Sequence, residues 1–203
     1  MHIRSFRYTP EMVDCRYCTE HARMPPHCKL PRCPWIAERI EAGVVGYREA
    51  VSFYHRCNPK LRERLNSLVI RFPNSLWLNQ AHQERMEHLK AVLHYSKKRN
   101  TPEWYAVLFL VSTSEDLYRR TINCFTKTSI DFSRASLRGI SVSDYTLLMA
   151  AKTIYTGEER LTLAELEDRE IVDDDTFRLV INAQLIARYG LPVLKITAKG
   201  GSS

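Results

Sequence analysis

Four cysteine residues near the start of the chain have a type and a spacing that can bind a metal ion. Cys15 and Cys18 are separated by two residues, and after nine more residues Cys28 and Cys33 form a second close pair. A Cys-x-x-Cys loop can direct two sulfurs at one point, and a second pair completes the tetrahedron that Zn²⁺ accepts. The spacing therefore predicts a structural zinc site with these four thiolates as ligands.

The segment between the two pairs is too polar and too rich in proline to form a helix or a central strand. It holds His21 and His27, either of which can replace a thiolate, and Cys57 beside His55 is a further alternative ligand. A loop with so little apolar surface needs another source of stability. A structural zinc ion supplies on the order of 10 kcal/mol or more of binding free energy, which becomes folding free energy.

Other uses of four thiols compete with zinc. Disulfides require an oxidising compartment, and the first residues, Met-His-Ile-Arg-Ser-Phe-Arg, contain no apolar signal segment, so a cytoplasmic location is expected. A thioredoxin-like redox pair requires a strand before it and a helix after it. An iron–sulfur cluster also binds four thiolates, although at other spacings. Zinc is the favoured interpretation, and the disulfide, redox and iron–sulfur alternatives stay open.

Positive charge is concentrated in the half of the chain that contains these cysteines. The 203 residues have a net charge of +7; residues 1–100 carry 18 Lys and Arg against 9 Asp and Glu, and residues 101–203 carry 12 against 14. Such a basic half predicts a nucleic acid, a nucleoprotein complex or an acidic protein surface as partner. A pI near 9.2 is also compatible with a purely solubilising role.

Cations beside the cysteines and at the end of a predicted helix are the candidate contacts to phosphate or to a basic-partner site. They are Arg16, Arg23, Lys29, Arg32, Lys97, Lys98 and Arg99. Phosphate contacts of this kind would make binding depend steeply on salt concentration. A different hypothesis is a protein–protein adaptor or a regulator of transfer or transcription, in which the zinc loop presents Tyr17 and Trp35 and no nucleic acid is contacted.

The elements that must position these residues are predicted to be mainly α-helical. Helix start and stop signals and apolar spacing predict helices over residues 34–42, 47–56, 60–72, 75–98, 101–111, 112–124, 141–155 and 177–189, with a short one beginning near 162. Residues 191–196 read as a terminal strand. The predicted organisation is a zinc-binding basic module (1–58), a helical domain (59–198) and a disordered tail (199–203). The longest apolar run, 105–111, is far shorter than a membrane span requires.

Several details of these helices follow from caps and spacing. Ser112 and Glu115 match a capping box, and Ser75 is placed to cap the long helix that follows it. Val51 and Tyr54 are expected to point inward. Spacings of three and four predict a buried face on two later helices, made of Leu61, Leu65, Leu68, Val69, Leu78, Ala81, Met86, Leu89, Val92 and Leu93.

No set of residues in the sequence has the spacing of a known catalytic site. Asp173, Asp174 and Asp175 open a predicted helix, where capping and the helix dipole explain them. His82 and His88 are six residues apart, so they diverge around a helix, whereas a two-histidine zinc helix needs a separation of four. There is no glycine-rich phosphate loop, and Cys124 reads as a small core residue. The chain is therefore expected to be non-enzymatic.

Several stretches in both halves of the chain carry a resemblance to a known group of proteins: Val13–Cys18, Cys33–Pro34, Arg39–Gly43, Ile130–Ser133, Leu137–Gly139, Leu161–Leu166 and Asp175–Ala183. On these stretches the chain resembles uncharacterised cysteine-rich helical proteins encoded on mobile genetic elements of Gram-positive bacteria. The resemblance implies a habitat and no catalytic residues. Small basic proteins of that habitat include inhibitors of host CRISPR–Cas defence, regulators of transfer and partners of relaxases, and a CRISPR–Cas effector is the most concrete partner it implies.

Overall fold

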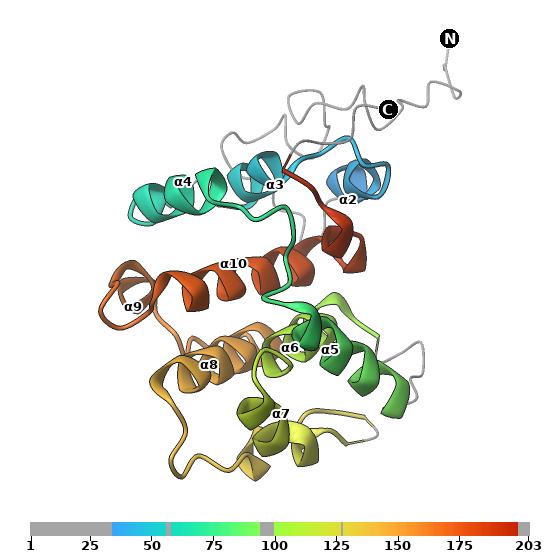
Figure 1. The fold of residues 1–203 in the computed structure, drawn as a ribbon, viewed down its shortest axis with the longest axis vertical. Helices are drawn as coiled ribbons and strands as arrows, with labels where there is room; N and C mark the ends of the chain where they lie inside the picture. The colour runs from blue at the N-terminus through green and yellow to red at the C-terminus, as the bar shows by residue number, and fades with distance from the viewer. Residues whose placement is uncertain (1–33, 56–57, 94–99, 127, 199–203) are drawn as a thin grey trace.

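The computed structural model describes residues 34–55, 58–93, 100–126 and 128–198 (Figure 1). These ranges are mainly helical, as predicted, and their only strand pairing is an isolated antiparallel bridge between Phe125 and Ile130. Their α-helices are α2 (Pro34–Glu41), α3 (Tyr47–Tyr54), α4 (Arg62–Ile70), α5 (Gln80–Val92), α6 (Pro102–Val111), α7 (Glu115–Thr121), α8 (Val142–Thr156), α9 (Leu163–Glu167) and α10 (Asp174–Tyr189). None of these helices is long and apolar enough to cross a membrane. The predicted zinc loop lies outside the described residues.

The helix α10 is the centre of the packing. Ten of its residues are buried, and a helix that is apolar on nearly every side must be covered on nearly every side. Figure 1 shows α10 crossing the middle of the molecule, with α2, α3 and α4 on one side and α5, α6 and α8 on the other. The same core cluster extends from Ile36 in α2 to Ile196 near the end of the described chain.

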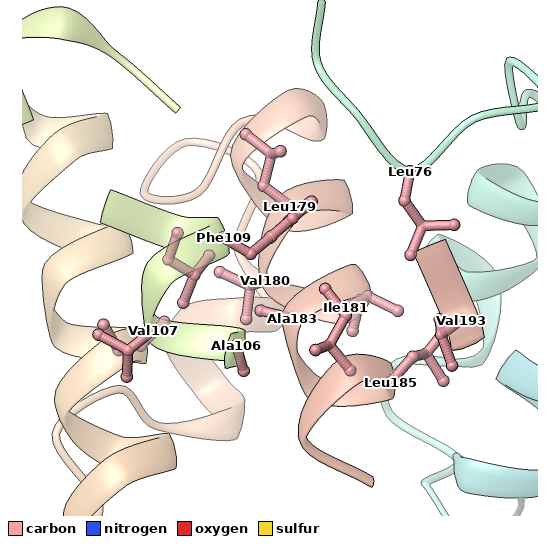
Figure 2. Packing of buried hydrophobic residues seen from close by; sticks show 14 of the residues in the cluster. Leu76, Ala106, Val107, Phe109, Leu179, Val180, Ile181, Ala183, Leu185 and Val193 are labelled. Carbon is pink, nitrogen blue, oxygen red and sulfur yellow. The ribbon is translucent and has the colours of Figure 1, made fainter. Parts of the chain in front are cut away.

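The apolar segment after Thr101 is a helix, as its start signals predict. Thr101 Oγ1 accepts a hydrogen bond from the backbone N–H of Trp104 at 3.3 Å, and Pro102 occupies the first helical turn. Every residue from Trp104 to Val111 except Tyr105 is buried. Figure 2 shows side chains of this helix, α6, beside those of α10, with which it makes its most extensive contact.

The helix α3 is held against α10 by a buried hydrogen-bond network. Tyr47 Oη donates to Asn182 Oδ1 at 2.7 Å, and Asn182 Nδ2 donates to the carbonyl oxygen of Leu76 at 3.0 Å. The Tyr47 ring also stacks on Phe72, with 3.8 Å between the ring centroids. Burial raises the pKa of Tyr47, so its hydroxyl stays a neutral donor. Three segments distant in sequence thus meet at one buried amide, whose oxygen and nitrogen are both satisfied.

The helix α4 is anchored by a buried arginine. The Arg64 side chain is 4% exposed and donates to the carbonyl oxygens of Leu166 at 2.7 Å and Val172 at 2.8 Å, and to Asp174 Oδ1 at 3.2 Å. Its guanidinium carbon lies 4.1 Å from the centroid of the Phe177 ring. A rigid guanidinium can satisfy several carbonyls at once, so this residue joins α4 to the α9–α10 connection.

The start of α5 differs from its prediction. The sequence predicts a cap at Ser75, whereas the cap is Asn79, whose Oδ1 accepts a hydrogen bond from the His82 backbone N–H at 2.9 Å. Ser75 Oγ accepts instead from the Trp77 backbone N–H at 3.2 Å. The segment between the two serves tertiary packing, because Leu76 is fully buried and its carbonyl binds α10. A strong local cap signal is therefore overridden by a distant contact.

The buried face of α5 is partly as predicted. Met86 and Leu89 are buried, which confirms two positions, but Ala81 and Val92 are exposed, so those two predictions are wrong. The third buried position is His82, one residue after Ala81. Two further predicted positions are half-buried, namely Leu78 and Leu93.

The segment predicted as a terminal strand is a 3₁₀ helix. It spans Leu191–Lys195 (η5) and is closed by hydrogen bonds from the backbone N–H of Val193 to Gly190 and from that of Ile196 to Val193. A strand needs a neighbouring strand to accept its hydrogen bonds, and the described residues place α2 beside this segment instead. Val193 is fully buried there.

Two smaller predictions are also corrected. The cap of α7 is Ser114, which accepts a hydrogen bond from the Leu117 backbone N–H at 3.0 Å, and Ser112 instead donates to the Leu108 carbonyl at 2.6 Å. Tyr54 is 39% exposed although it was expected to point inward. The helices predicted to begin near residues 141 and 162 are capped by Ser141 and Thr162, and the capping role predicted for the acidic run is confirmed at Asp173.

The anchoring role of Arg64 predicts a large difference between two arginine substitutions. Arg64→Met keeps much of the side-chain volume but leaves buried carbonyls without donors, so we expect the free energy of unfolding to fall by about 3 kcal/mol. Arg71 binds the same carboxylate from a position that is 70% exposed, so Arg71→Met should cost less than about 1 kcal/mol. Urea denaturation followed by circular dichroism measures both values, and equal losses would contradict the anchoring role.

Candidate functional site

The predicted metal ligands and phosphate contacts lie outside the part of the chain that the structure describes. This applies to Cys15, Cys18, Cys28 and Cys33, to the alternative ligands, and to the cations Arg16, Arg23, Lys29, Arg32, Lys97, Lys98 and Arg99. Trp35 belongs to α2. Within the described ranges no group of three or more His, Cys, Asp or Glu side chains is placed to hold a metal ion.

The described residues that have reactive side chains are mostly used by the fold. Cys124 is fully buried, which confirms its prediction as a core residue, and burial raises the pKa of its thiol to about 11. A thiol with that pKa is neutral near pH 7 and is neither a nucleophile nor a ligand of choice.

The two histidines of α5 have separate surroundings. His82 is fully buried; its Nδ1 accepts from the Leu78 backbone N–H at 3.2 Å, and its Nε2 lies 2.7 Å from the Phe109 carbonyl oxygen. These two bonds fix the tautomer with the proton on Nε2. His88 is exposed, and its Nδ1 lies 3.0 Å from Tyr118 Oη. The imidazoles therefore do not converge on a common point.

A cleft of about 330 Å³ between α4 and the start of α10 contains several charged side chains that neutralise one another. Asp174 Oδ1 lies 3.2 Å from Arg64 Nη2, and Asp174 Oδ2 lies 3.4 Å from Arg71 Nη1. Asp175 Oδ1 lies 3.3 Å from Arg178 Nη2. Asp173 is the helix cap, with its Oδ1 accepting from a backbone N–H in the first turn. The acidic run thus has the structural role that its sequence position predicts.

A second cleft, of about 530 Å³, lies between α3 and α4 on the basic half of the chain. Two helical faces line it, because residues spaced by three and four positions share one side of a helix. From α3 and the residue after it come Arg48, Ser52 and His55, and from α4 come Arg62, Asn66 and Val69. We refer to this as the α3–α4 cleft.

The arginines of the α3–α4 cleft, unlike those of the first cleft, are not ion-paired with carboxylates of the described residues. Arg48 and Arg62 are exposed, and their side chains make no hydrogen bond or ion pair with any described residue. The one carboxylate among the described lining residues is Glu49, and its Oε2 accepts a hydrogen bond from the Gly46 backbone N–H at 2.9 Å. The cleft therefore presents two cations and a carboxylate that already caps a helix.

The remaining lining is apolar on the floor and polar on the rim. Val51 and Leu65 are buried, and Phe53 and Val69 are half-buried. The rim adds hydroxyl and amide groups, which can both donate and accept hydrogen bonds, from Ser52, Asn58 and Asn66.

His55 lies at the end of α3 and lines the same cleft. Burial lowers the pKa of its imidazole to about 4, so the ring is neutral near pH 7. Its Nε2 is buried and has no hydrogen-bond partner among the described residues, and its ring meets Tyr54 edge to face at 4.6 Å between centroids. Among the described residues, the positive charge of the cleft therefore comes from the two arginines alone.

Comparison of the chain with protein-family models, with curated protein sequences and with solved structures gives no match.

The cleft residues were not among the sites predicted from the sequence. Their signal is present, because positions 48, 52 and 55 and positions 62, 66 and 69 each follow helical spacing. Spacing alone does not say which two helix faces meet, since a seven-residue connection separates α3 from α4. Packing on the centre of the fold brings the two faces together.

Buried His82 predicts a stability that depends on pH. Burial lowers the pKa of its imidazole to about 4, against 6.5 for the free side chain. The unfolded chain therefore takes up a proton first as the pH falls, and the stability present above about pH 6.5 is lost progressively toward pH 4. In His82→Gln, melting temperatures measured between these pH values should fall less steeply than in the wild type.

The exposed His88→Gln is the matched control, because it removes an imidazole from the same helix without removing a buried one. A control profile that changes as much as that of His82→Gln would contradict this assignment.

Proposed function

We propose that the chain is a non-enzymatic binding protein whose basic front half binds a nucleic acid or a nucleoprotein. The α3–α4 cleft is the observation that carries the proposal. It offers Arg48 and Arg62, which are exposed and have no partner among the described residues. The one carboxylate in the described lining is used as a helix cap. An arginine fork matches the geometry of phosphate oxygens.

The distribution of charge along the chain supports the same proposal. Residues 34–55 and 58–93 contain 8 Lys and Arg and 6 Asp and Glu. Among these eight cations, Arg64, Arg71 and Lys90 are ion-paired, and Arg85 donates to two backbone carbonyls. The cleft arginines are therefore available to a partner that carries negative charge.

The zinc site is the second part of the proposal. Cys15, Cys18, Cys28 and Cys33 bind one Zn²⁺, and the ion gives the front segment a fixed shape that presents Arg16, Arg23, Lys29 and Arg32 toward the same partner. The spacing of the thiols supports this reading. The resemblance to cysteine-rich proteins of mobile elements supports a host CRISPR–Cas effector as a target, because such an effector exposes both RNA and DNA.

Binding through phosphate contacts predicts a steep dependence on salt. Affinity for labelled single-stranded and double-stranded oligonucleotides, measured by fluorescence anisotropy, should fall about tenfold or more between about 50 mM and 200 mM salt as counterion release weakens. Affinity that is the same at both salt concentrations would contradict the proposal, and absence of binding to every oligonucleotide would favour a protein partner.

The zinc site predicts a metal content and its loss on mutation. The purified protein should contain about one zinc ion per chain, and Cys28→Ser should lower that content, whereas Cys124→Ala should not, because Cys124 is buried in the second half. Elemental analysis measures this directly, and chelation should lower the melting temperature because the ion contributes folding free energy.

Two observations would overturn the zinc assignment. One is an unchanged zinc content in Cys28→Ser, which would remove that residue from the ligand set. The other is a brown protein that absorbs near 400 nm, roughly where iron–sulfur centres absorb.

A further inference from the structure

We propose that the α3–α4 cleft holds one nucleotide of a single-stranded nucleic acid, with backbone phosphates on Arg48 and Arg62 and the base against the apolar floor. This inference rests on the proposed function and adds the strand state and the residues that select it. It is carried by the charge, the lining and the size of the cleft.

The charge of the cleft fits a phosphodiester. Both arginines are exposed, and neither side chain has a partner among the described residues. Arg48 is the second residue of α3 and Arg62 is the first residue of α4. A cation in the first turn opposes the helix dipole and is slightly destabilising. Neither cation is stabilised by a partner among the described residues, whereas both would attract a phosphate bound in the cleft.

The lining of the cleft fits a nucleobase. Val51 and Leu65 are buried beneath the lining, and the half-buried Phe53 and Val69 expose apolar surface to the face of a base. Asn58 and Asn66 on the rim can hydrogen-bond to base edges in either direction. Amides that can each donate and accept do not select a single base, so we expect little sequence preference.

The size of the cleft favours a single strand. A volume of about 530 Å³ falls in the range of sites that enclose one small molecule. A duplex keeps its bases stacked and paired, so no base is free to enter the cleft, whereas a single strand can turn a base outward. Duplex DNA or RNA would meet only the rim arginines.

The test uses the full, metal-loaded chain and a labelled single-stranded oligonucleotide, with a hairpin duplex of the same sequence as competitor. Arg48→Gln and Arg62→Gln should each weaken single-strand binding roughly tenfold. Each should also reduce the slope of the logarithm of the binding constant against the logarithm of the salt concentration by about 0.7. The matched control is Arg119→Gln on α7, which lies at the opposite end of the molecule from α3 and α4 (Figure 1) and is 75% exposed. It should bind as the wild type does.

A second pair of variants tests the cleft without removing a cation. Asn66→Asp is isosteric and exposed, and it introduces a carboxylate beside the proposed phosphate position, so affinity should fall. Asn123→Asp makes the same change at an exposed position in the second half of the chain, and its affinity should stay at the wild-type value. Melting temperatures show whether each variant is folded.

The outcomes separate this inference from the proposed function. If the wild type binds single strands but the cleft variants match their controls, the cleft is not the site and the proposed function stands. If the duplex competes as well as the unlabelled single strand, or poly-glutamate displaces the oligonucleotide equally well, the single-nucleotide inference is wrong. If the wild type binds no nucleic acid, this inference is wrong and so is the nucleic-acid part of the proposed function, which leaves a protein surface as the partner.

Discussion

The arrangement of the described chain depends on the requirement that buried polar groups be hydrogen-bonded where they meet α10. Two side chains meet this requirement for the front half. Tyr47 reaches the buried amide of Asn182, and Arg64 reaches the carbonyls of the α9–α10 connection. An unpaired buried donor or acceptor costs about 1–3 kcal/mol, so each bond admits few alternatives. These two contacts set the positions of α3 and α4, and hence the existence of a cleft between them.

The two clefts beside α4 show how the same residue type has different consequences. On the side of α10, Arg71 and Arg178 face the carboxylates that open that helix, and every charge has a partner. On the side of α3, Arg48 and Arg62 line a cleft whose one described carboxylate, Glu49, is hydrogen-bonded to the Gly46 backbone. Cations paired within the fold contribute to its connections, and cations without such partners remain available to a ligand. The proposal of a phosphate-binding surface follows from this contrast.

Local signals predicted much of the helical structure correctly. Caps at Thr101 and Asp173 depend on hydrogen bonds within one turn, so the sequence around them is sufficient. The wrong predictions occur where a contact with a residue distant in sequence determines the local conformation. Leu76 is buried in the core, and α5 begins after it instead of at Ser75. Residues 191–196 pack on α2 and pair with no strand among the described residues. An apolar run predicts that its side chains will be buried, but it does not predict which other element they will pack against.

The sequence by itself determined the mainly helical class, the caps of several helices, and the cysteine spacing on which the zinc hypothesis is based. These are properties of neighbouring residues and of short-range hydrogen bonds. Only the tertiary structure decided that α3 and α4 expose one face each to a common cleft, and that Arg64 is an anchor while Arg48 and Arg62 have no partner among the described residues. The reason is physical: the partners of Arg64 are carbonyls and a carboxylate more than a hundred residues away, and no local pattern specifies their position.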